Sequence, residues 1–274
     1  MNLVLHHGIF GFAALGPIVY FNGVSQHLRT KFPGLRILVT QVALDGTIAR
    51  RGTELGQQIA QAVLPGGALA PDEPVHIIAH SMGGLDARFL LSPANQSNMA
   101  NRIVSLTTVA TPHQGSPIAD VIVVTEDALV GNDEDKLLGH ALRTALAQAH
   151  IHVGGLRDLT TDGVRRFNAQ FPDNASTKKF SVAGVGRGIK VFGVSLDTCV
   201  ALRLAYRIIM ARTGEDNDGL VSLGSATWGS EVRRWPADHA DEIGHNLDLG
   251  LQARPFHFDY LAEYEVLVDR LTSL

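Results

Sequence analysis

Short apolar runs rich in β-branched residues alternate along the chain with segments in which apolar residues recur at helical spacing. Strands that alternate with helices predict an α/β fold, with a mostly parallel sheet covered by helices on both faces. We find no internal repeat or linker, so we expect one domain over residues 1–274. The predicted strands are Leu3–Leu5, Arg36–Val42, Val75–His80, Ile103–Val109, Phe180–Val185, Lys190–Val194 and Val232–Trp235. The predicted helices are Thr53–Val63, one from Ser81 to about Leu91, Thr198–Arg212 and Phe256–Leu271.

Residues 126–155 interrupt this alternation. The segment begins with acidic residues, continues with an Ala/Leu-rich helical pattern around His140–Ala149, and ends at Gly154 and Gly155. An insertion with its own helix, bounded by glycines, predicts a mobile cap or lid over an active site. The alternative is a further helix that covers the sheet.

The strand at Val75–His80 leads directly into a serine flanked by small residues, in the string Ala79-His80-Ser81-Met82-Gly83. A buried strand, a sharp turn and a helix produce this pattern, and the serine at the turn lies at the carboxyl end of the sheet. Gly83 lets the helix pass close to the strand. The pattern is typical of the nucleophile elbow, usually G-x-S-x-G, with Ala79 in place of the first glycine. The simpler alternative is that Ser81 caps a helix.

A second glycine-containing loop follows the first strand, at His6-His7-Gly8-Ile9-Phe10-Gly11-Phe12. In hydrolases with a nucleophile elbow, a loop at this place donates a backbone N–H to the oxyanion. The predicted donors are the N–H groups of Ile9 and of Met82, the residue after the serine. Alone, the loop is equally well explained as a plain turn, and the elbow downstream favours the oxyanion hole.

In hydrolases with a nucleophile elbow, an acidic residue and then a histidine follow the serine along the chain. Asp218, which precedes a glycine and an apolar pair, is the first candidate for the acid, and Asp216 is the second candidate. His239, His245 and His257 follow, and the last of these falls within the predicted final helix. The residues alone do not decide between His239 and His245. Such a set would transfer an acyl group from an ester through the serine to water.

Composition narrows the classes of function. The chain is 45% apolar and 18% charged, as in ordinary globular proteins with a sizeable core. A net charge of −4 without acidic or basic runs argues against nucleic-acid binding. No apolar stretch is long enough to span a bilayer, and Cys199 is the single cysteine, so an intramolecular disulfide is excluded. No signal-peptide pattern precedes Leu3–Leu5, so we expect a cytoplasmic protein or export without such a signal.

Motifs spread over nearly the whole chain resemble the Pseudomonas-type bacterial lipases, which are α/β-hydrolases of triacylglycerols and other carboxylic esters. The matching segments are His7–Phe12, Val39–Val42, Arg51–Leu55, Thr111–Ser116, Arg166–Pro172, Asn217–Val221 and Asp238–Ile243. The resemblance implies an α/β-hydrolase fold with a helical lid. In that family N-D-G-L-V carries the catalytic aspartate and (N/D)-H-x-D-E-(V/I) the catalytic histidine. It therefore assigns Asp218 and His239 to a triad with Ser81, and makes His80 a supporting neighbour.

The substrate that the resemblance implies is a lipid ester at a lipid interface. A carboxylesterase that acts on short soluble esters and an acyltransferase with the same triad are the alternatives. The single cysteine matches the shorter members of the family, which have no disulfide. The need for a folding partner is left open.

The resemblance also implies a structural Ca²⁺ ion and no organic cofactor. In the family two aspartate carboxylates and two main-chain carbonyls hold the ion, which here correspond to Asp197, Asp241, and the carbonyls of His245 and Leu249. Hard oxygen ligands of this kind suit Ca²⁺. The ion would tether the loop of the catalytic histidine. The alternative for Asp197 is an N-cap of the helix predicted to begin at residue 198.

Overall fold

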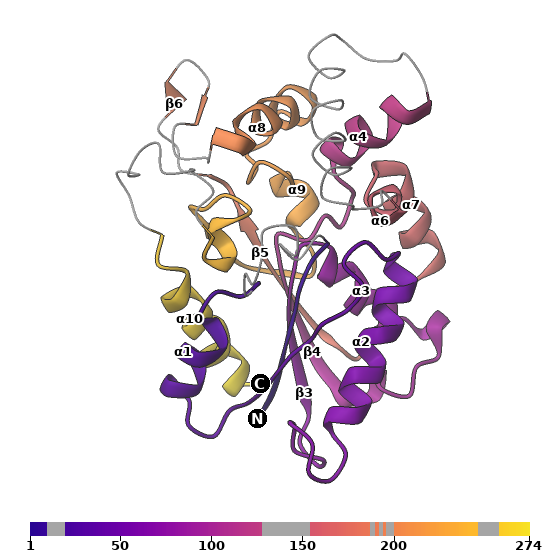
Figure 1. The fold of residues 1–274 in the computed structure, drawn as a ribbon, viewed down its shortest axis with the longest axis vertical. Coiled ribbons are helices and arrows are strands. Elements are labelled where there is room, and N and C mark those ends of the chain that lie inside the picture. Colours follow the sequence, from indigo (N-terminus) through magenta and orange to yellow (C-terminus); the bar gives the residue numbers. More distant parts are fainter. Residues whose placement is uncertain (10–19, 128–153, 187–189, 192–193, 196–199, 246–257) are drawn as a thin grey trace.

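Six parallel strands form a single sheet in the order β2-β1-β3-β4-β5-β8 (Figure 1). The computed structural model describes residues 1–9, 20–127, 154–186, 190–191, 194–195, 200–245 and 258–274. The strands are β1 (Asn2–His6), β2 (Arg36–Val39), β3 (Val75–His80), β4 (Ile103–Val109), β5 (Lys178–Gly184) and β8 (Ser230–Trp235). Each of them was predicted within a few residues, and the α/β class is confirmed.

The prediction of one strand at 190–194 is wrong. Two short strands, β6 (Lys190–Val191) and β7 (Val194–Ser195), pair antiparallel with each other and do not join the main sheet. The residues between them lie outside the described part of the chain.

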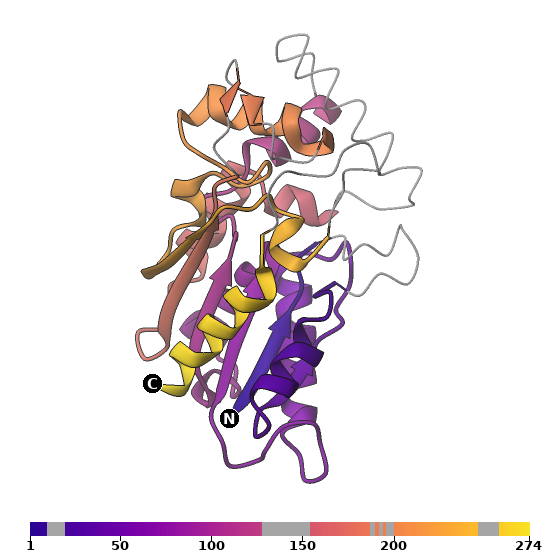
Figure 2. The same cartoon turned by 90° about the vertical axis from the view of Figure 1, so that its left-hand side faces the viewer.

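Helices cover both faces of the sheet, as alternation predicted (Figures 1 and 2). On one face lie α1 (Val24–Lys31) and α10 (Tyr260–Thr272), and on the other α2 (Ile48–Ala62) and α3 (Met82–Leu91). Successive side chains of a strand point to opposite faces. A strand that is covered on both faces can therefore contribute to two cores.

The alternation is visible in β1. Leu3 and Leu5 join the core beneath α1 and α10, whereas Val4, between them, joins the core beneath α2 and α3. All three are fully buried. Burial of a leucine or valine side chain stabilises the fold by about 1.5–3 kcal/mol relative to exposure. The two cores hold the sheet rigid beneath the loops at its carboxyl edge.

A third group of helices gathers at the carboxyl ends of the strands (Figure 1). Residues 128–153, most of the predicted lid, lie outside the described part of the chain. None of the helices within the described part is long and apolar enough to cross a membrane. The helices of this group are α4 (Pro117–Asp127), α6 (Gly154–Asp158), α7 (Thr161–Gln170), α8 (Val200–Thr213) and α9 (Leu223–Ala226).

Helix α2 begins at Ile48, five residues before the start predicted at Thr53. Thr47 caps it, since its side-chain oxygen accepts a hydrogen bond from the backbone N–H of Arg50 at 3.3 Å. The next residue, Arg51, is fully buried. An arginine usually marks a solvent-facing position, so the apolar periodicity concealed the first turn of this helix.

Candidate active site

Ser81 occupies the turn between β3 and α3 with a strained backbone, φ 57° and ψ −134°. Such values are rare for a residue with a side chain and concentrate at functional sites. Its backbone N–H donates to the carbonyl of Val109 at 2.8 Å, while its side chain makes no capping hydrogen bond to α3. The N-cap alternative is therefore wrong, and the local geometry is that of an elbow.

The sharp turn depends on how closely α3 approaches β1. A Cβ atom at Gly83 would lie 2.7 Å from the carbonyl oxygen of His7 and 2.9 Å from that of His6. Only glycine fits so near another backbone. Ala79, by contrast, is fully buried in the core under α2 and α3. Its methyl group is accommodated there, so the turn does not require the usual first glycine.

His239 lies between Ser81 and Asp218 and is hydrogen-bonded to both. Its Nε2 atom is 3.0 Å from Ser81 Oγ, and its Nδ1 atom is 2.7 Å from Asp218 Oδ2. The three side chains come from separate loops at the carboxyl edge, after β3, after α8 and after β8. All three residues are buried. The structure thus brings together the three residues that the resemblance assigned to a triad.

The Asp218 carboxylate is held on both of its oxygens. Oδ1 accepts hydrogen bonds from the backbone N–H groups of Leu220 at 2.8 Å and Val221 at 2.7 Å, which leaves Oδ2 for His239. The backbone N–H of His239 also donates to the carbonyl of Asp218 at 3.0 Å. The acid and the histidine are therefore fixed to each other by main chain as well as side chain.

The other candidates for acid and base lie apart from this set. The main-chain carbonyl of Asp216 accepts a hydrogen bond from the N–H of Leu223 at 2.8 Å. His245 Nε2 donates to the carbonyl of Tyr20 at 3.0 Å. His257 lies outside the described residues, and α10 begins after it, at Tyr260. Of the two histidines that the residues alone left open, His239 contacts Ser81 and Asp218, and His245 contacts Tyr20.

His80 and Glu242 form a second buried pair beside the triad. The Nε2 atom of His80 is 2.9 Å from Glu242 Oε2, and its Nδ1 atom is 2.6 Å from the hydroxyl of Tyr20. Burial lowers the pKa of His80 well below its usual value. Burial, and then the carboxylates of Asp218 and other nearby aspartates, raises the pKa of Glu242 well above its usual value. Both pKa shifts favour the neutral forms of His80 and Glu242, so the contact between them is a hydrogen bond and not an ion pair.

This pair packs against His239, because the His80 and His239 rings lie 4.5 Å apart between centroids. Sequence reasoning gave His80 its supporting place but missed Tyr20 and Glu242. The Asp-Glu pair of the histidine motif was the available signal for Glu242. No sequence signal pointed to Tyr20, since it lies sixty positions before its partner His80. The ligand atoms of His80, His239 and Glu242 lie within 4.8 Å of one another, but hydrogen bonds already occupy them.

The predicted oxyanion loop adjoins the nucleophile. A Cβ atom at Gly8 would lie 2.6 Å from Ser81 Cβ and 2.8 Å from the Tyr20 hydroxyl, so only glycine fits there. Ile9 follows directly. Met82 is the first residue of α3, where backbone N–H groups have no partner within the helix. Met82 therefore follows the serine directly in the chain, and Ile9 follows the glycine that packs against it.

Two of the four predicted calcium ligands lie within the described residues. Asp197 and Leu249 lie outside the described residues. Asp241 and His245 lie in the loop after His239, where the backbone N–H of His245 donates to the carbonyl of Ala240 at 2.9 Å. Several carboxylates crowd this loop, and their mutual repulsion is an environment that a cation would relieve. The described half of the set fits a hard cation in donor chemistry and charge.

A serine hydrolase of the α/β-hydrolase class is defined by this sheet, elbow and hydrogen-bonded Ser-His-Asp set. Comparison with known proteins shows to which family within this class the chain belongs. A triacylglycerol lipase of Vibrio cholerae is 30% identical to this chain, over 98% of the chain and 86% of that protein. A triacylglycerol lipase of Pseudomonas fragi is 29% identical, over 89% of the chain and 87% of that protein. The chain belongs to the triacylglycerol lipase family of carboxylic ester hydrolases.

The fold comparison agrees. Residues 40–174 match a PGAP1-like alpha/beta domain. The Staphylococcus hyicus lipase superposes with a TM-score of 0.66 at 20% identity, covering 98% of this chain and 95% of that one. A metagenomic carboxyl esterase superposes with a TM-score of 0.74 at 19% identity, covering all of this chain and 76% of that one. These likenesses establish the fold.

Proposed function

We propose that this protein hydrolyses carboxylic esters with Ser81 as nucleophile, His239 as general base and Asp218 as the acid that orients the histidine. The observation that carries the proposal is the position of His239, hydrogen-bonded to the serine hydroxyl on one side and the carboxylate on the other. A histidine held in this way activates a serine hydroxyl. Membership in the triacylglycerol lipase family supports the same reaction.

In the first half of the reaction Ser81 Oγ attacks the carbonyl carbon of the ester, and His239 Nε2 accepts the hydroxyl proton. Asp218 holds the Nδ1–H tautomer and stabilises the imidazolium. The imidazolium then gives its proton to the leaving alcohol, and the acyl group stays on the serine. In the second half water attacks this acyl-enzyme, His239 again takes the proton, and the carboxylic acid is released.

The negative charge that develops on the carbonyl oxygen in each half is stabilised by the N–H groups of Ile9 and Met82. This assignment is supported by the close approach of Gly8 to the serine and by the place of Met82 at the start of α3. Removal of one such donor in a serine hydrolase costs about 2.7–4 kcal/mol of transition-state stabilisation. The two donors together thus account for a large part of the rate enhancement over the uncatalysed reaction.

The proposed substrate is a lipid ester, with triacylglycerol first. The names of the Vibrio cholerae and Pseudomonas fragi relatives support it. A series of esters of increasing acyl length, measured below and above the solubility limit of each, tests the class. A rate that rises above the solubility limit is expected of a lipase. Smooth saturation on short soluble esters would instead identify a carboxylesterase.

We also propose that Asp241 and the carbonyl of His245 contribute to a structural Ca²⁺ site, with Asp197 and the carbonyl of Leu249. The donor chemistry and the crowded carboxylates of the loop support it. The ion would brace the His239 loop and take no part in a chemical step. A thermal melt should shift to lower temperature in EDTA and recover with Ca²⁺, and Asp241→Asn should abolish this shift. A melt unaffected by EDTA would contradict the site.

The catalytic proposal is tested with Ser81→Ala. The variant should keep the thermal unfolding temperature of the wild type within a few degrees, because the serine side chain is small. It should lose p-nitrophenyl ester hydrolysis down to the residual level left by binding alone, a loss of about 10⁶-fold. Activity of the wild-type order in the folded variant would refute the assignment.

A further inference from the structure

The two peptide groups that carry the proposed oxyanion donors share one feature: a side chain donates a hydrogen bond to the carbonyl of each. The N–H of Met82 and the carbonyl of Ser81 belong to one peptide group, and the N–H of Ile9 and the carbonyl of Gly8 to the other. We propose that Thr111 and His7 are positioning residues that fix these two peptide planes and so aim the donors. The inference rests on the proposed function and extends it to residues outside the triad.

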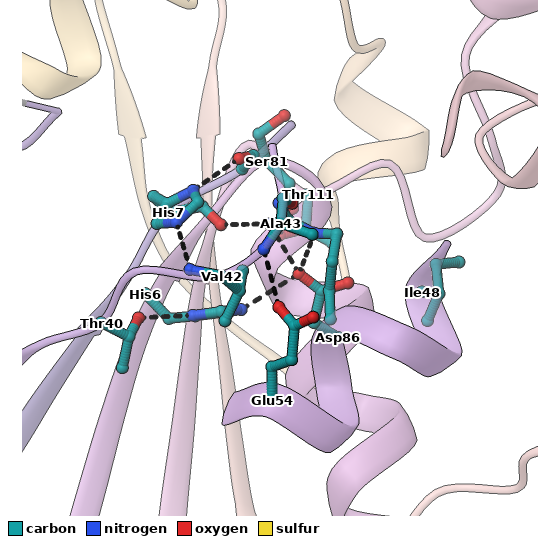
Figure 3. A network of polar contacts seen from close by, with 12 residues as sticks. His6, His7, Thr40, Val42, Ala43, Ile48, Glu54, Ser81, Asp86 and Thr111 are labelled. Carbon is teal, nitrogen blue, oxygen red and sulfur yellow. Dashed lines mark hydrogen bonds and ion pairs between the residues drawn. The ribbon is translucent and has the colours of Figure 1, made fainter. Parts of the chain in front are cut away.

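Thr111 acts on the first plane. Its hydroxyl donates to the carbonyl of Ser81 at 2.7 Å in a buried contact (Figure 3). The N–H of Gly84 donates to the same oxygen at 3.1 Å. Thr111 stands directly against α3, because a Cβ atom at Gly84 would lie 2.1 Å from its hydroxyl oxygen. Ala110, just before it, has a left-handed φ of 47°. The turn after β4 is strained to deliver this hydroxyl.

His7 acts on the second plane. Its Nδ1 lies 2.8 Å from the carbonyl oxygen of Gly8, and its Nε2 lies 3.0 Å from the backbone nitrogen of Val42 (Figure 3). A carbonyl only accepts and a backbone N–H only donates, so the ring is neutral with its proton on Nδ1. Burial lowers the pKa of His7 to about 3, which keeps this form at neutral pH.

The position of His7 is itself fixed. Its carbonyl accepts a hydrogen bond from Arg51 at 2.7 Å, and Arg51 also donates to Asp86 at 2.8 Å. Asp86 also accepts a contact from His6 at 3.0 Å (Figure 3). All of these side chains are buried. The loop after β1 is thus bound to α2 and α3 through polar contacts that leave it little freedom.

The consequence for catalysis follows from the planarity of the peptide bond. In a trans peptide the C=O and N–H point in opposite directions, so a donor that fixes the oxygen also fixes the direction of the N–H. A hydrogen bond accepted by the carbonyl also polarises the peptide and strengthens its N–H as a donor. Oxyanion stabilisation depends on donors that need no reorientation during the reaction. Thr111 and His7 supply this preorganisation without touching the substrate.

The first test compares Thr111→Val, Thr111→Ser and Thr177→Val on a soluble ester. Thr177 is a matched control at the amino end of β5, where its buried hydroxyl also donates to a carbonyl, that of Ile103 at 3.4 Å. Thr111→Val should lower kcat about tenfold with KM nearly unchanged, less than the 10²–10³-fold loss of a whole donor. Thr111→Ser should restore most of kcat, and Thr177→Val should keep the wild-type kcat.

A second pair of variants tests the other plane and does not depend on the first. Asn places an amide near the position of Nδ1, and Gln places one near that of Nε2. His7→Asn should therefore retain several-fold more kcat than His7→Gln, with thermal melts recorded for both to count only folded protein.

The proposal is overturned if folded Thr111→Val keeps wild-type kcat, if it loses no more than Thr177→Val, or if His7→Gln equals His7→Asn. Wild-type hydrolysis that Ser81→Ala abolishes, together with unchanged kcat in these variants, would reject the positioning role alone. Absence of ester hydrolysis in the wild type would instead reject the proposed function.

Discussion

Asp218 illustrates how much of the site depends on single atoms. One of its oxygens accepts two backbone N–H groups, and the other accepts His239 Nδ1. In Asp218→Asn an amide replaces one oxygen and favours the wrong histidine tautomer. We expect kcat to fall about 10⁴-fold, as for the equivalent change in a serine protease, with KM little altered.

Steady-state kinetics on a soluble ester measure this loss, and a thermal melt shows that the variant is folded. A fall in kcat of less than tenfold would mean that Asp218 does not set the orientation of His239. At this scale the sequence supplied the serine from its local pattern alone. The residues alone did not separate His239 from His245, since both lie in one loop and differ in what they reach across the fold. Only the resemblance to a known family assigned His239.

Helix α3 carries the elbow, and its approach to β1 is the element-scale feature on which the site depends. A Cβ atom at Gly83 would meet two backbone carbonyl oxygens at 2.9 Å or less. Because neither can move aside, Gly83→Ala should force the helix outward and destabilise the fold by about 1–3 kcal/mol. Activity should fall with it, since Ser81 directly precedes this helix.

Gly56→Ala in α2 is the matched control. Its Cβ atom would meet only the end of the Leu90 side chain, at 2.8 Å, which can rotate away. Alanine also favours a helix over glycine, so the stability of this variant should change by less than about 1 kcal/mol. Urea unfolding of both variants provides the comparison, and equal stabilities would contradict the close-approach argument.

Elements with strong local signals were predictable, and those defined by long-range contacts were not. Strand β4 matches its prediction residue for residue, because six of its seven residues are apolar or β-branched. Strand β2 ends at Val39, three residues early, because the backbone of Val42 bonds to His7 instead of to a neighbouring strand. Helix α1 was missed, since its eight residues include only two buried ones.

At the scale of the whole molecule, buried histidines tie stability to pH. Burial lowers the pKa of His7 to about 3 and that of His113 well below its usual value of 6.5. Below pH 6.5 the unfolded chain binds protons at these positions that the folded protein does not. These two histidines therefore have no effect on stability above pH 6.5 and lower it as the pH falls, by up to about 1.4 kcal/mol per pH unit for each histidine. The raised pKa of Glu242 acts in the opposite sense, because the folded protein keeps a proton there that the unfolded chain has lost.

Urea unfolding at pH 8, 7, 6 and 5.5 measures this dependence. The difference in free energy of unfolding between the wild type and His7→Gln isolates His7 from the opposite effect of Glu242. This difference should be nearly level from pH 8 to 7 and should shift against the wild type below pH 6.5. A difference that stays level down to pH 5.5 would show that His7 takes up a proton without cost in the folded state. These shifts arise from tertiary burial, so composition gave no sign of them.

The central claim is that Ser81 is a nucleophile activated by His239. The most direct test is the rate at which a fluorophosphonate modifies the protein, with the modified peptide identified by mass spectrometry. The account predicts rapid modification of Ser81 alone in the wild type, and modification slowed by several orders of magnitude in folded His239→Ala. Labelling at another serine, or at the same rate in His239→Ala, would contradict it.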